Sequence, residues 1–156
     1  MMDVKTNVMR ILDGLKLPYQ AHPYKAVEAL SGVEVADQLG LAREQVFKTL
    51  VTVGKSKKYY VFMIPVAQEL NLKKAATVTN EKSIEMIKAK ELLPLTGYVH
   101  GGCSPIGMKK TFPTYLDETA QLYSAIYFSA GKIGMQVEMP VAVLQQALMV
   151  QLADLT

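Results

Sequence analysis

The sequence is poor in the residues that build metal centres and disulfides. Its 156 residues include 1 cysteine, 2 histidines and no tryptophan. One cysteine cannot form an internal disulfide, which is typical of a reducing compartment. A zinc site needs three or four His, Cys or acidic ligands, and neither HExxH nor CxxC is present. We therefore expect no metal and no cofactor.

Long apolar runs and two common enzyme motifs are also missing. Apolar runs such as residues 61–67 are too short to cross a bilayer. The first ten residues lack the apolar centre of a signal peptide. We therefore expect a cytoplasmic protein with no membrane partner. The absence of GxSxG and of GxxxxGK[ST] argues against a serine hydrolase elbow and a nucleotide P-loop.

The charge balance is only mildly positive. A formal net charge of +3 is not that of a chromatin-type binder, so we expect no DNA partner. The lysines are clustered, however, and taken together they are compatible with a phosphate-bearing partner, although solvated turns and helix faces explain each cluster taken singly. The clusters are Lys55, Lys57 and Lys58; Lys73 and Lys74; Lys82, Lys88 and Lys90; and Lys109 and Lys110.

The remaining composition is that of a globular domain, with 50% hydrophobic and 20% charged residues. The length favours one domain over residues 1–156. Apolar periodicity, capping residues and turns predict helices over 3–14, 31–40, 69–76, 81–93 (ended by Pro94) and 141–149, and strands over 19–24, 46–53, 59–64, 111–118, 122–129 and 135–139. This order mixes hairpins with helices. It predicts a single-domain α+β fold with a mixed, largely antiparallel sheet and flanking helices.

Lys48 is the most unusual residue of the pattern. It lies in the middle of VFKTLVTV (46–53), a strand whose two faces are both mostly apolar and which is therefore expected to be covered on both sides. A buried lysine needs a partner for its charge, or its pKa falls. A lysine that reaches solvent at a sheet edge is the alternative, but we favour a functional lysine.

Two glycine-rich segments are candidate binding loops. Residues 101–110, GGCSPIGMKK, can form a cradle of backbone N–H groups for an anion or a ribose, or a plain turn that needs positive φ. Its cysteine, Cys103, lies three residues from His100, but we interpret it as a small buried side chain rather than a nucleophile. SAGKIG (129–134) is explained by a hairpin turn unless the fold brings it close to Lys48.

Three segments together resemble a known family. FKTL (47–50), GGCSPIGMKK (101–110) and YFSAGKIGMQVEM (127–139) are similar to the conserved blocks of the YbaK/EbsC family, and AHPY (21–24) agrees in position. Members of this family are trans-editing aminoacyl-tRNA deacylases related to the editing domain of bacterial prolyl-tRNA synthetases. The resemblance implies an α+β fold with a pocket. It also implies clearance of mischarged tRNA, usually Cys-tRNA(Pro).

The resemblance also implies roles for individual residues. Lys48 corresponds to the family's essential lysine. Substrate-binding positions correspond to Tyr24 near the entrance, Thr49 in the pocket, Gly101 and Gly102 beside the scissile ester, and Ser129 at the last hairpin. Ser31 and Gln136 depart from the pattern, because the best-known members carry phenylalanine and aspartate there. These departures bear on amino-acid preference and leave the reaction class unchanged.

The expected partners are the acceptor end of mischarged tRNA and, through the resemblance, prolyl-tRNA synthetase. Two other functions stay open from the sequence. One is a tRNA- or synthetase-associated binding module without turnover, and the other is a deacylase that prefers another small amino acid such as alanine. No serine, cysteine or histidine is placed as a protein nucleophile, so water or the thiol of a cysteinyl substrate is expected to attack the ester.

Overall fold

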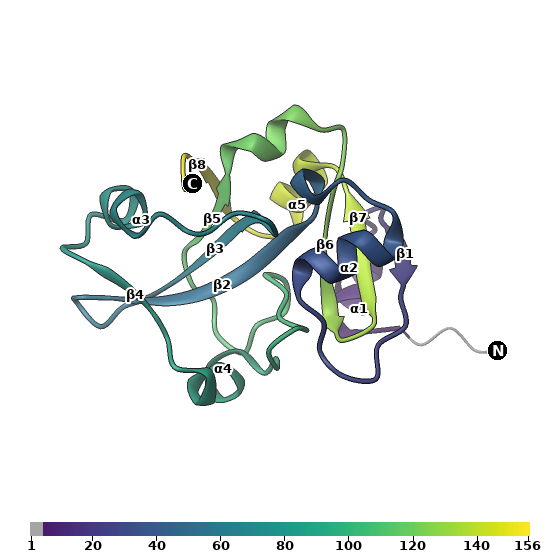
Figure 1. The fold of residues 1–156 in the computed structure, drawn as a ribbon, viewed down its shortest axis with the longest axis horizontal. Coiled ribbons are helices and arrows are strands. Elements are labelled where there is room, and N and C mark those ends of the chain that lie inside the picture. The colour runs from purple at the N-terminus through teal and green to yellow at the C-terminus, as the bar shows by residue number, and fades with distance from the viewer. Residues whose placement is uncertain (1–4) are drawn as a thin grey trace.

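The computed structural model describes residues 5–156, and Figure 1 shows their arrangement. The helices of this part are α1 (Asn7–Gly14), α2 (Gly32–Leu39), α3 (Leu72–Thr79), α4 (Ala89–Thr96) and α5 (Val141–Ala147), with 3-10 turns η1 (Arg43–Gln45) and η2 (Glu118–Leu122). The strands are β1 (Gln20–Pro23), β2 (Phe47–Gly54), β3 (Tyr59–Pro65), β4 (Ile84–Met86), β5 (Thr114–Asp117), β6 (Ile126–Lys132), β7 (Met135–Met139) and β8 (Val150–Ala153). No helix within residues 5–156 has the length and apolar character needed to span a bilayer.

The strands form two sheets. One has the order β1-β7-β6 and is antiparallel throughout, and the other has the order β4-β2-β3-β5-β8. In the second sheet β4, β2 and β3 are antiparallel, whereas β5 and β8 join in parallel. The predicted α+β fold with mixed, largely antiparallel pairing is therefore confirmed, although the pairing is divided between two sheets. The two sheets meet at an isolated parallel bridge between Val46 and Tyr127.

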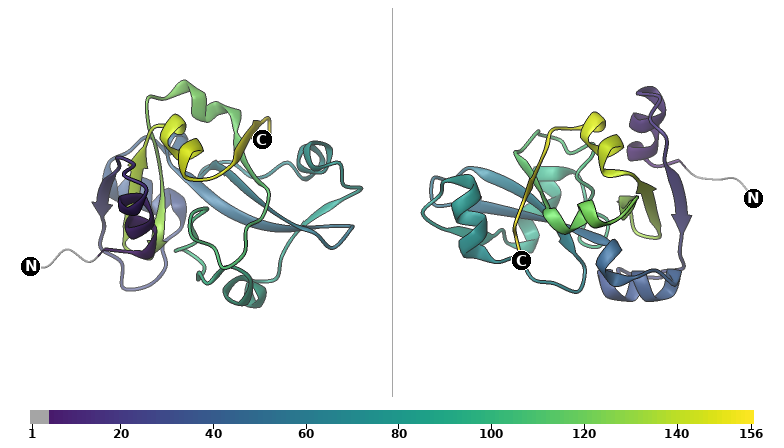
Figure 2. Two further views of the ribbon diagram at one scale, coloured as in Figure 1. Left: turned by 180° about the vertical axis from the view of Figure 1, so that it is seen from behind. Right: turned by 90° about the horizontal axis from the view of Figure 1, so that it is seen from above.

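Helices cover the five-stranded sheet on both faces, as expected for a strand with two apolar faces. Phe47 and Val51 of β2 pack into the main core with residues of α1, β6 and α5. Leu50, on the other face, packs against a second cluster that includes Ala75 and Ala76 of α3. Figure 2 shows α3 and α4 on different sides of the long β2–β3 hairpin. Strand β2 is thus packed on both faces, although Lys48, Thr49 and Leu50 are themselves only partly buried.

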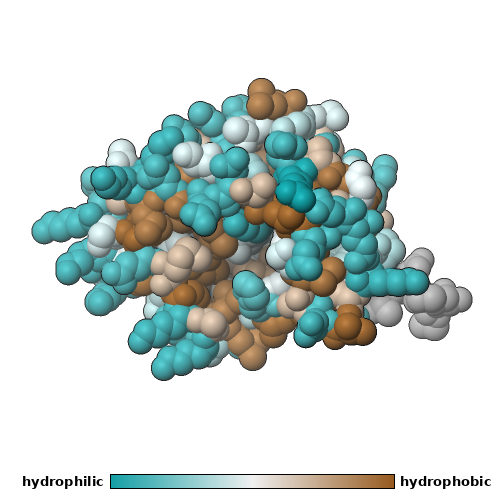
Figure 3. Space-filling view, in the orientation of Figure 1, coloured by the Kyte–Doolittle hydropathy of each residue, from teal (hydrophilic) through white to brown (hydrophobic). Residues whose placement is uncertain are grey.

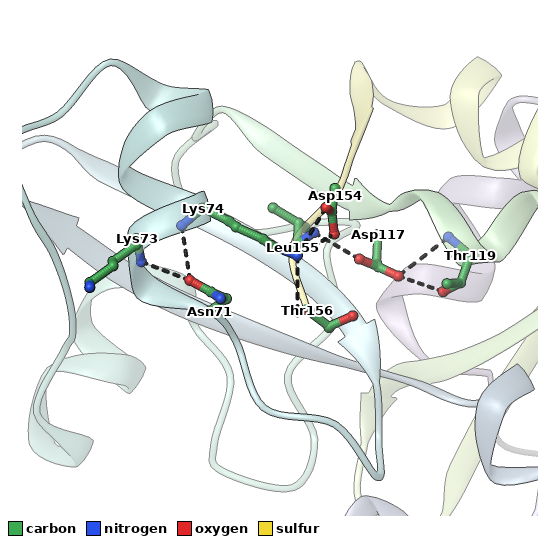
Figure 4. A network of polar contacts seen from close by, with 8 residues as sticks. All are labelled: Asn71, Lys73, Lys74, Asp117, Thr119, Asp154, Leu155 and Thr156. Carbon is green, nitrogen blue, oxygen red and sulfur yellow. Dashed lines mark hydrogen bonds and ion pairs between the residues drawn. The ribbon is translucent and has the colours of Figure 1, made fainter.

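The C-terminal residues are hydrogen-bonded to the start of α3 and to the end of β5, as Figure 4 shows. The backbone N–H of Leu155 donates to a carboxylate oxygen of Asp117 (2.9 Å), and the carbonyl oxygen of Leu155 accepts from the N–H of Asn71 (2.8 Å). Lys74 bonds to both Asp154 and Thr156. The Leu155 side chain is fully buried. Strand β8, which the sequence analysis missed, is held here because it pairs in parallel with β5.

Most predicted elements are present with shifted ends. Residues 3 and 4 of the predicted first helix lie outside the described residues, and α1 begins at Asn7 because the Thr6 side chain caps it. Likewise α3 begins at Leu72, after the cap residue Asn71. The predicted strand over 122–129 begins later, since η2 extends to Leu122.

The predicted continuous helix over 81–93 is wrong. Residues 84–86 form strand β4, which pairs with Thr52–Gly54 of β2, and the helix begins at Ala89. Pairing with an open strand edge outweighs the weak helical periodicity of this segment. Pro94 lies inside α4 rather than at its end, and the helix ends at Gly97 in the left-handed conformation.

Candidate active site

A cavity of about 310 Å³ lies between the two sheets, α2 and the loop after α4. Figure 3 shows a hollow near the middle of the corresponding face, with apolar residues around it and hydrophilic side chains projecting from the edges. The cavity brings together six of the eight predicted site residues: Ser31, Lys48, Thr49, Gly101, Ser129 and Gln136. Tyr24 and Gly102 are not part of its lining.

The cavity lies where two different strands, β4 and β6, approach the two ends of one edge of β2. Strand β4 pairs with the far end of β2, from Thr52 to Gly54, while β6 forms a bridge with Val46, the residue before β2 begins. Between these contacts β6 and β4 diverge. The edge of β2 around Thr49 therefore faces the cavity rather than another strand.

Helix α2 places Ser31 at the mouth of the cavity. Ser31 is the N-cap, and its side chain accepts from the N–H of Glu34 while Glu34 bonds back to the N–H of Ser31. This capping box fixes the direction of the chain as it enters the helix. Gly32, the next residue, packs so closely on Val66 that a Cβ would lie 2.4 Å from that side chain. Ser31 is therefore a structural cap as well as a cavity residue.

Lys48 is half-buried and lines the cavity. Burial lowers the pKa of its ammonium group, and the charge of Glu69 acts in the opposite direction. Among residues 5–156 no ion pair to Lys48 is formed. The cavity thus contains a desolvated cation whose charge is not neutralised by direct contact, which is the situation of a lysine that meets an anion or a developing negative charge of a substrate.

Two buried polar atoms in the cavity wall have no hydrogen-bond partner within the described chain. They are Oγ1 of Thr49 and Oε1 of Gln136. Gln136 is 6% exposed. An unpartnered buried polar atom costs free energy, on the order of 1–3 kcal/mol. Such atoms in a cavity wall are typical of a site that bonds to a ligand.

The fold brings the SAGKIG segment close to Lys48, since Ser129 lines the same cavity as Lys48. Its hydroxyl accepts from the N–H of Gly131 (3.1 Å) where the register of β6 and β7 shifts. Gly131 has φ of 90°. The segment SAGKIG is therefore both an irregular hairpin and a wall of the site.

The glycine-rich loop contributes Gly101 and Cys103 to the wall. Gly101 has φ of 87°, and a Cβ there would lie 2.7 Å from the Cβ of Ala29. The N–H of Gly102 donates to the carbonyl of Val99 (3.0 Å), so it is used by a turn. Cys103 is a free, buried thiol, and burial raises its pKa to about 12. It is therefore protonated at neutral pH, in agreement with the interpretation of Cys103 as a packed side chain.

Some cavity residues were not predicted as site residues. His100 is exposed and lines the cavity, and Leu30 and Leu92 form apolar parts of its wall. Nothing in the sequence marks the two leucines, because single leucines at helix and loop positions are common. Within residues 5–156 no cluster of three or more His, Cys, Asp or Glu could hold a metal ion.

Comparison with known proteins defines the class. Residues 27–147 match the family model of the aminoacyl-tRNA editing domain. The chain therefore belongs to the aminoacyl-tRNA editing domain family, and it is an aminoacyl-tRNA deacylase.

A curated relative is more specific. The chain is 51% identical over 142 residues to EbsC of Enterococcus faecalis, to which Cys-tRNA(Pro)/Cys-tRNA(Cys) deacylase activity is assigned; the match covers 90% of this chain and 87% of EbsC. Solved structures agree in fold. A trans-editing enzyme for prolyl tRNA synthetase is 24% identical with a TM-score of 0.82 and covers 99% of both chains. A hypothetical protein is 21% identical with a TM-score of 0.85, covering 95% of this chain and 97% of its own.

Proposed function

We propose that this protein is a trans-editing deacylase that releases cysteine from Cys-tRNA(Pro), and from Cys-tRNA(Cys) as a second substrate. The observation that carries the proposal is the cavity itself: it holds a desolvated lysine but no activated protein nucleophile. Its thiol, Cys103, is held protonated by burial. In the part of the chain that the structure describes, neither histidine forms a hydrogen bond to a hydroxyl or thiol.

The attacking group then comes from the substrate or from water. A cysteinyl ester carries its own thiol beside the carbonyl carbon, and such proximity is a large advantage over bulk water. The thiolate sulfur bonds to the carbonyl carbon, the bond from that carbon to the ribose oxygen breaks, and the ribose oxygen takes up a proton. The released product is a cyclic thioester, which water opens to cysteine.

In this reaction the protein contributes position and charge. We assign to Lys48 the catalytic role, either by polarising the ester or by holding the phosphate of the terminal nucleotide. Thr49, Ser129 and Gln136 bind the aminoacyl group, with Ser31 and Gly101 at its boundary. For Tyr24 and Gly102, which lie outside the lining, we propose supporting roles near the entrance and in the loop. The clustered lysines hold the acceptor stem through phosphates without reading its sequence.

The setting of the reaction is also part of the proposal. We infer a cytoplasmic protein that meets mischarged tRNA at the acceptor end, with prolyl-tRNA synthetase as a protein partner. The whole of residues 1–156 acts as one editing domain. A single domain of this size has few surfaces for reading the rest of a tRNA, so selection of the tRNA by a synthetase partner is consistent with its architecture.

The decisive experiment is deacylation of a panel of mischarged tRNAs by the purified protein. We expect Cys-tRNA(Pro) to be cleaved fastest, followed by Cys-tRNA(Cys), with Ala-tRNA(Pro) and Ser-tRNA slower because they lack the thiol. Cleavage of the alanyl substrate as fast as the cysteinyl one would identify water as the nucleophile. Binding without cleavage of any substrate would instead identify a binding module.

A further inference from the structure

The free edge of β2 at Thr49 carries an inference about how the substrate is held, and it rests on the proposed function. In an antiparallel strand, the N–H and C=O of one residue point to the same side, and successive residues alternate. The N–H of Gly54 donates to Lys58 across the hairpin (2.8 Å), so Gly54 faces β3. Because successive residues alternate, the backbone N–H and C=O groups of Thr52, Leu50 and Lys48 also point to β3.

The intervening residues face the other edge. The carbonyl oxygen of Val51 accepts from the N–H of Ile87 (3.3 Å), beside β4. Thr49, two residues earlier, therefore directs its N–H and C=O to the same edge. Its register partner is Met63, without a kink or bulge in the pairing of β2 with β3.

Nothing in residues 5–156 pairs with this edge at Thr49. The register of β4 with β2 ends at Thr52, and in the described chain β6 forms its bridge at Val46, the residue before β2, and not at Thr49. No backbone or side-chain hydrogen bond to the Thr49 backbone is formed outside the sheet. Instead Thr49 lines the cavity, and its Oγ1 is buried and unpartnered there. A second unpartnered atom, Oε1 of the 94%-buried Gln136, lies in the same wall.

The backbone of Thr49 offers one donor, its N–H, and one acceptor, its C=O. These two groups complement the carbonyl acceptor and the ammonium donor of an aminoacyl ester. A residue in a hydrogen-bonded antiparallel pair receives one bond and gives one bond to the residue opposite. An aminoacyl group offers an ammonium donor and a carbonyl acceptor on either side of its Cα. It can therefore take the place of one strand residue, as in recognition by strand addition.

We propose that the backbone of Thr49 binds the aminoacyl group as a single added strand residue. The C=O of Thr49 accepts from the α-ammonium, and its N–H donates to the ester carbonyl oxygen, where negative charge develops during cleavage. Opposite residues of an antiparallel pair place their side chains on the same face. The substrate side chain therefore lies beside Oγ1 of Thr49, on the face of Phe47 and Cys103. Lys48 is on the other face, where it meets the phosphate or the ribose side of the ester.

Amide hydrogen exchange measured by NMR tests the binding directly. The probe is 3′-(L-cysteinylamino)-3′-deoxyadenosine, whose amide link cannot be cleaved as an ester. We expect protection of the Thr49 amide to rise at least tenfold with the probe, while the Leu50 amide, which faces β3, is unchanged. The probe without the α-amine should bind roughly 10–100-fold more weakly, because one charge-assisted hydrogen bond is lost. Thr49→Val keeps the backbone and should keep the protection.

Backbone substitution tests the role in catalysis. Replacing Thr49 by its α-hydroxy acid analogue removes the N–H and should lower kcat/KM for Cys-tRNA(Pro) by roughly 10²–10³, with little change in Tm because no strand of the described chain pairs with that edge at Thr49. The same replacement at Leu50 removes a bond to β3 and should lower Tm while leaving the remaining folded enzyme active.

The two proposals fail separately. An unprotected Thr49 amide with the probe bound, or no binding of the probe, overturns strand-like binding even if the protein deacylates Cys-tRNA(Pro). Protection of Thr49 in a protein that cleaves none of the tRNAs supports strand-like binding and refutes the deacylase proposal. If the Thr49 backbone variant and the wild type have equal kcat/KM, the N–H of Thr49 has no role in catalysis, and that part of the proposal is refuted.

Discussion

Replacement of Lys48 by methionine separates catalysis from folding. Methionine keeps most of the aliphatic length of lysine and removes the charge. The ammonium group is desolvated and forms no ion pair in the described chain, so its loss should change the free energy of unfolding by less than about 1 kcal/mol. Burial lowers its pKa below the usual value, which means that folding already disfavours the charged form. The direction of any stability change at neutral pH is therefore an increase.

The expected loss of activity is much larger. In a half-buried site with an effective dielectric constant of about 20, a unit charge about 4 Å from a developing anion contributes roughly 4 kcal/mol. Each 1.4 kcal/mol is a factor of ten, so kcat/KM should fall by up to about 10³. Lys48→Ala should behave alike, and Lys48→Arg should also be poor because a planar guanidinium does not replace a compact ammonium.

The assay pairs single-turnover deacylation of Cys-tRNA(Pro) with thermal unfolding of the same preparations. Lys16→Met is the matched control, since Lys16 is an exposed lysine that belongs neither to the lysine clusters nor to the cavity lining. It should leave both measurements near wild type. Turnover of Lys48→Met within a few-fold of wild type, or a large fall in its Tm, would refute the reasoning.

Four further measurements probe other parts of the site. Glu69→Gln removes a charge that raises the pKa of Lys48, so the alkaline limb of kcat/KM should move to lower pH; an unmoved limb means that Lys48 is not the titrating group. Cys103→Ser should keep most activity, whereas alkylation of the cysteinyl substrate should stop its release, and the reverse pattern makes Cys103 the nucleophile. Gly101→Ala should lower Tm as well as turnover, because it has positive φ and a Cβ would meet Ala29; an unchanged Tm would show that the loop yields. The affinity for tRNA should fall linearly on a plot of log K against log salt, and a flat line would remove the lysine clusters from binding.

Local chemistry determined much of this fold from the sequence. The capping box at Ser31, the left-handed glycine at Gly40 and the hairpin between β2 and β3 follow from residues close together in the chain. The apolar faces around Lys48 predicted a strand covered on both sides, and the structure confirms it. Elements whose existence depends on a distant partner were harder. Residues 84–86 form a strand because an edge of β2 is available, and β8 forms because β5 is beside it.

The same division holds for the site. The residue types and the resemblance to a family identified four site residues from the sequence: Lys48, Thr49, Ser129 and Gln136. Only the tertiary structure brings these four residues together in one cavity. The tertiary structure also decided which backbone groups are free. Thr49 and Leu50 are neighbours in one strand, yet the backbone groups of Thr49 point to an edge with which no strand of residues 5–156 pairs at that position, and those of Leu50 point to β3. Sequence gives the alternation of a strand, whereas the presence or absence of a neighbouring strand depends on how distant segments pack, because the hydrogen bonds of a sheet join residues far apart in the chain.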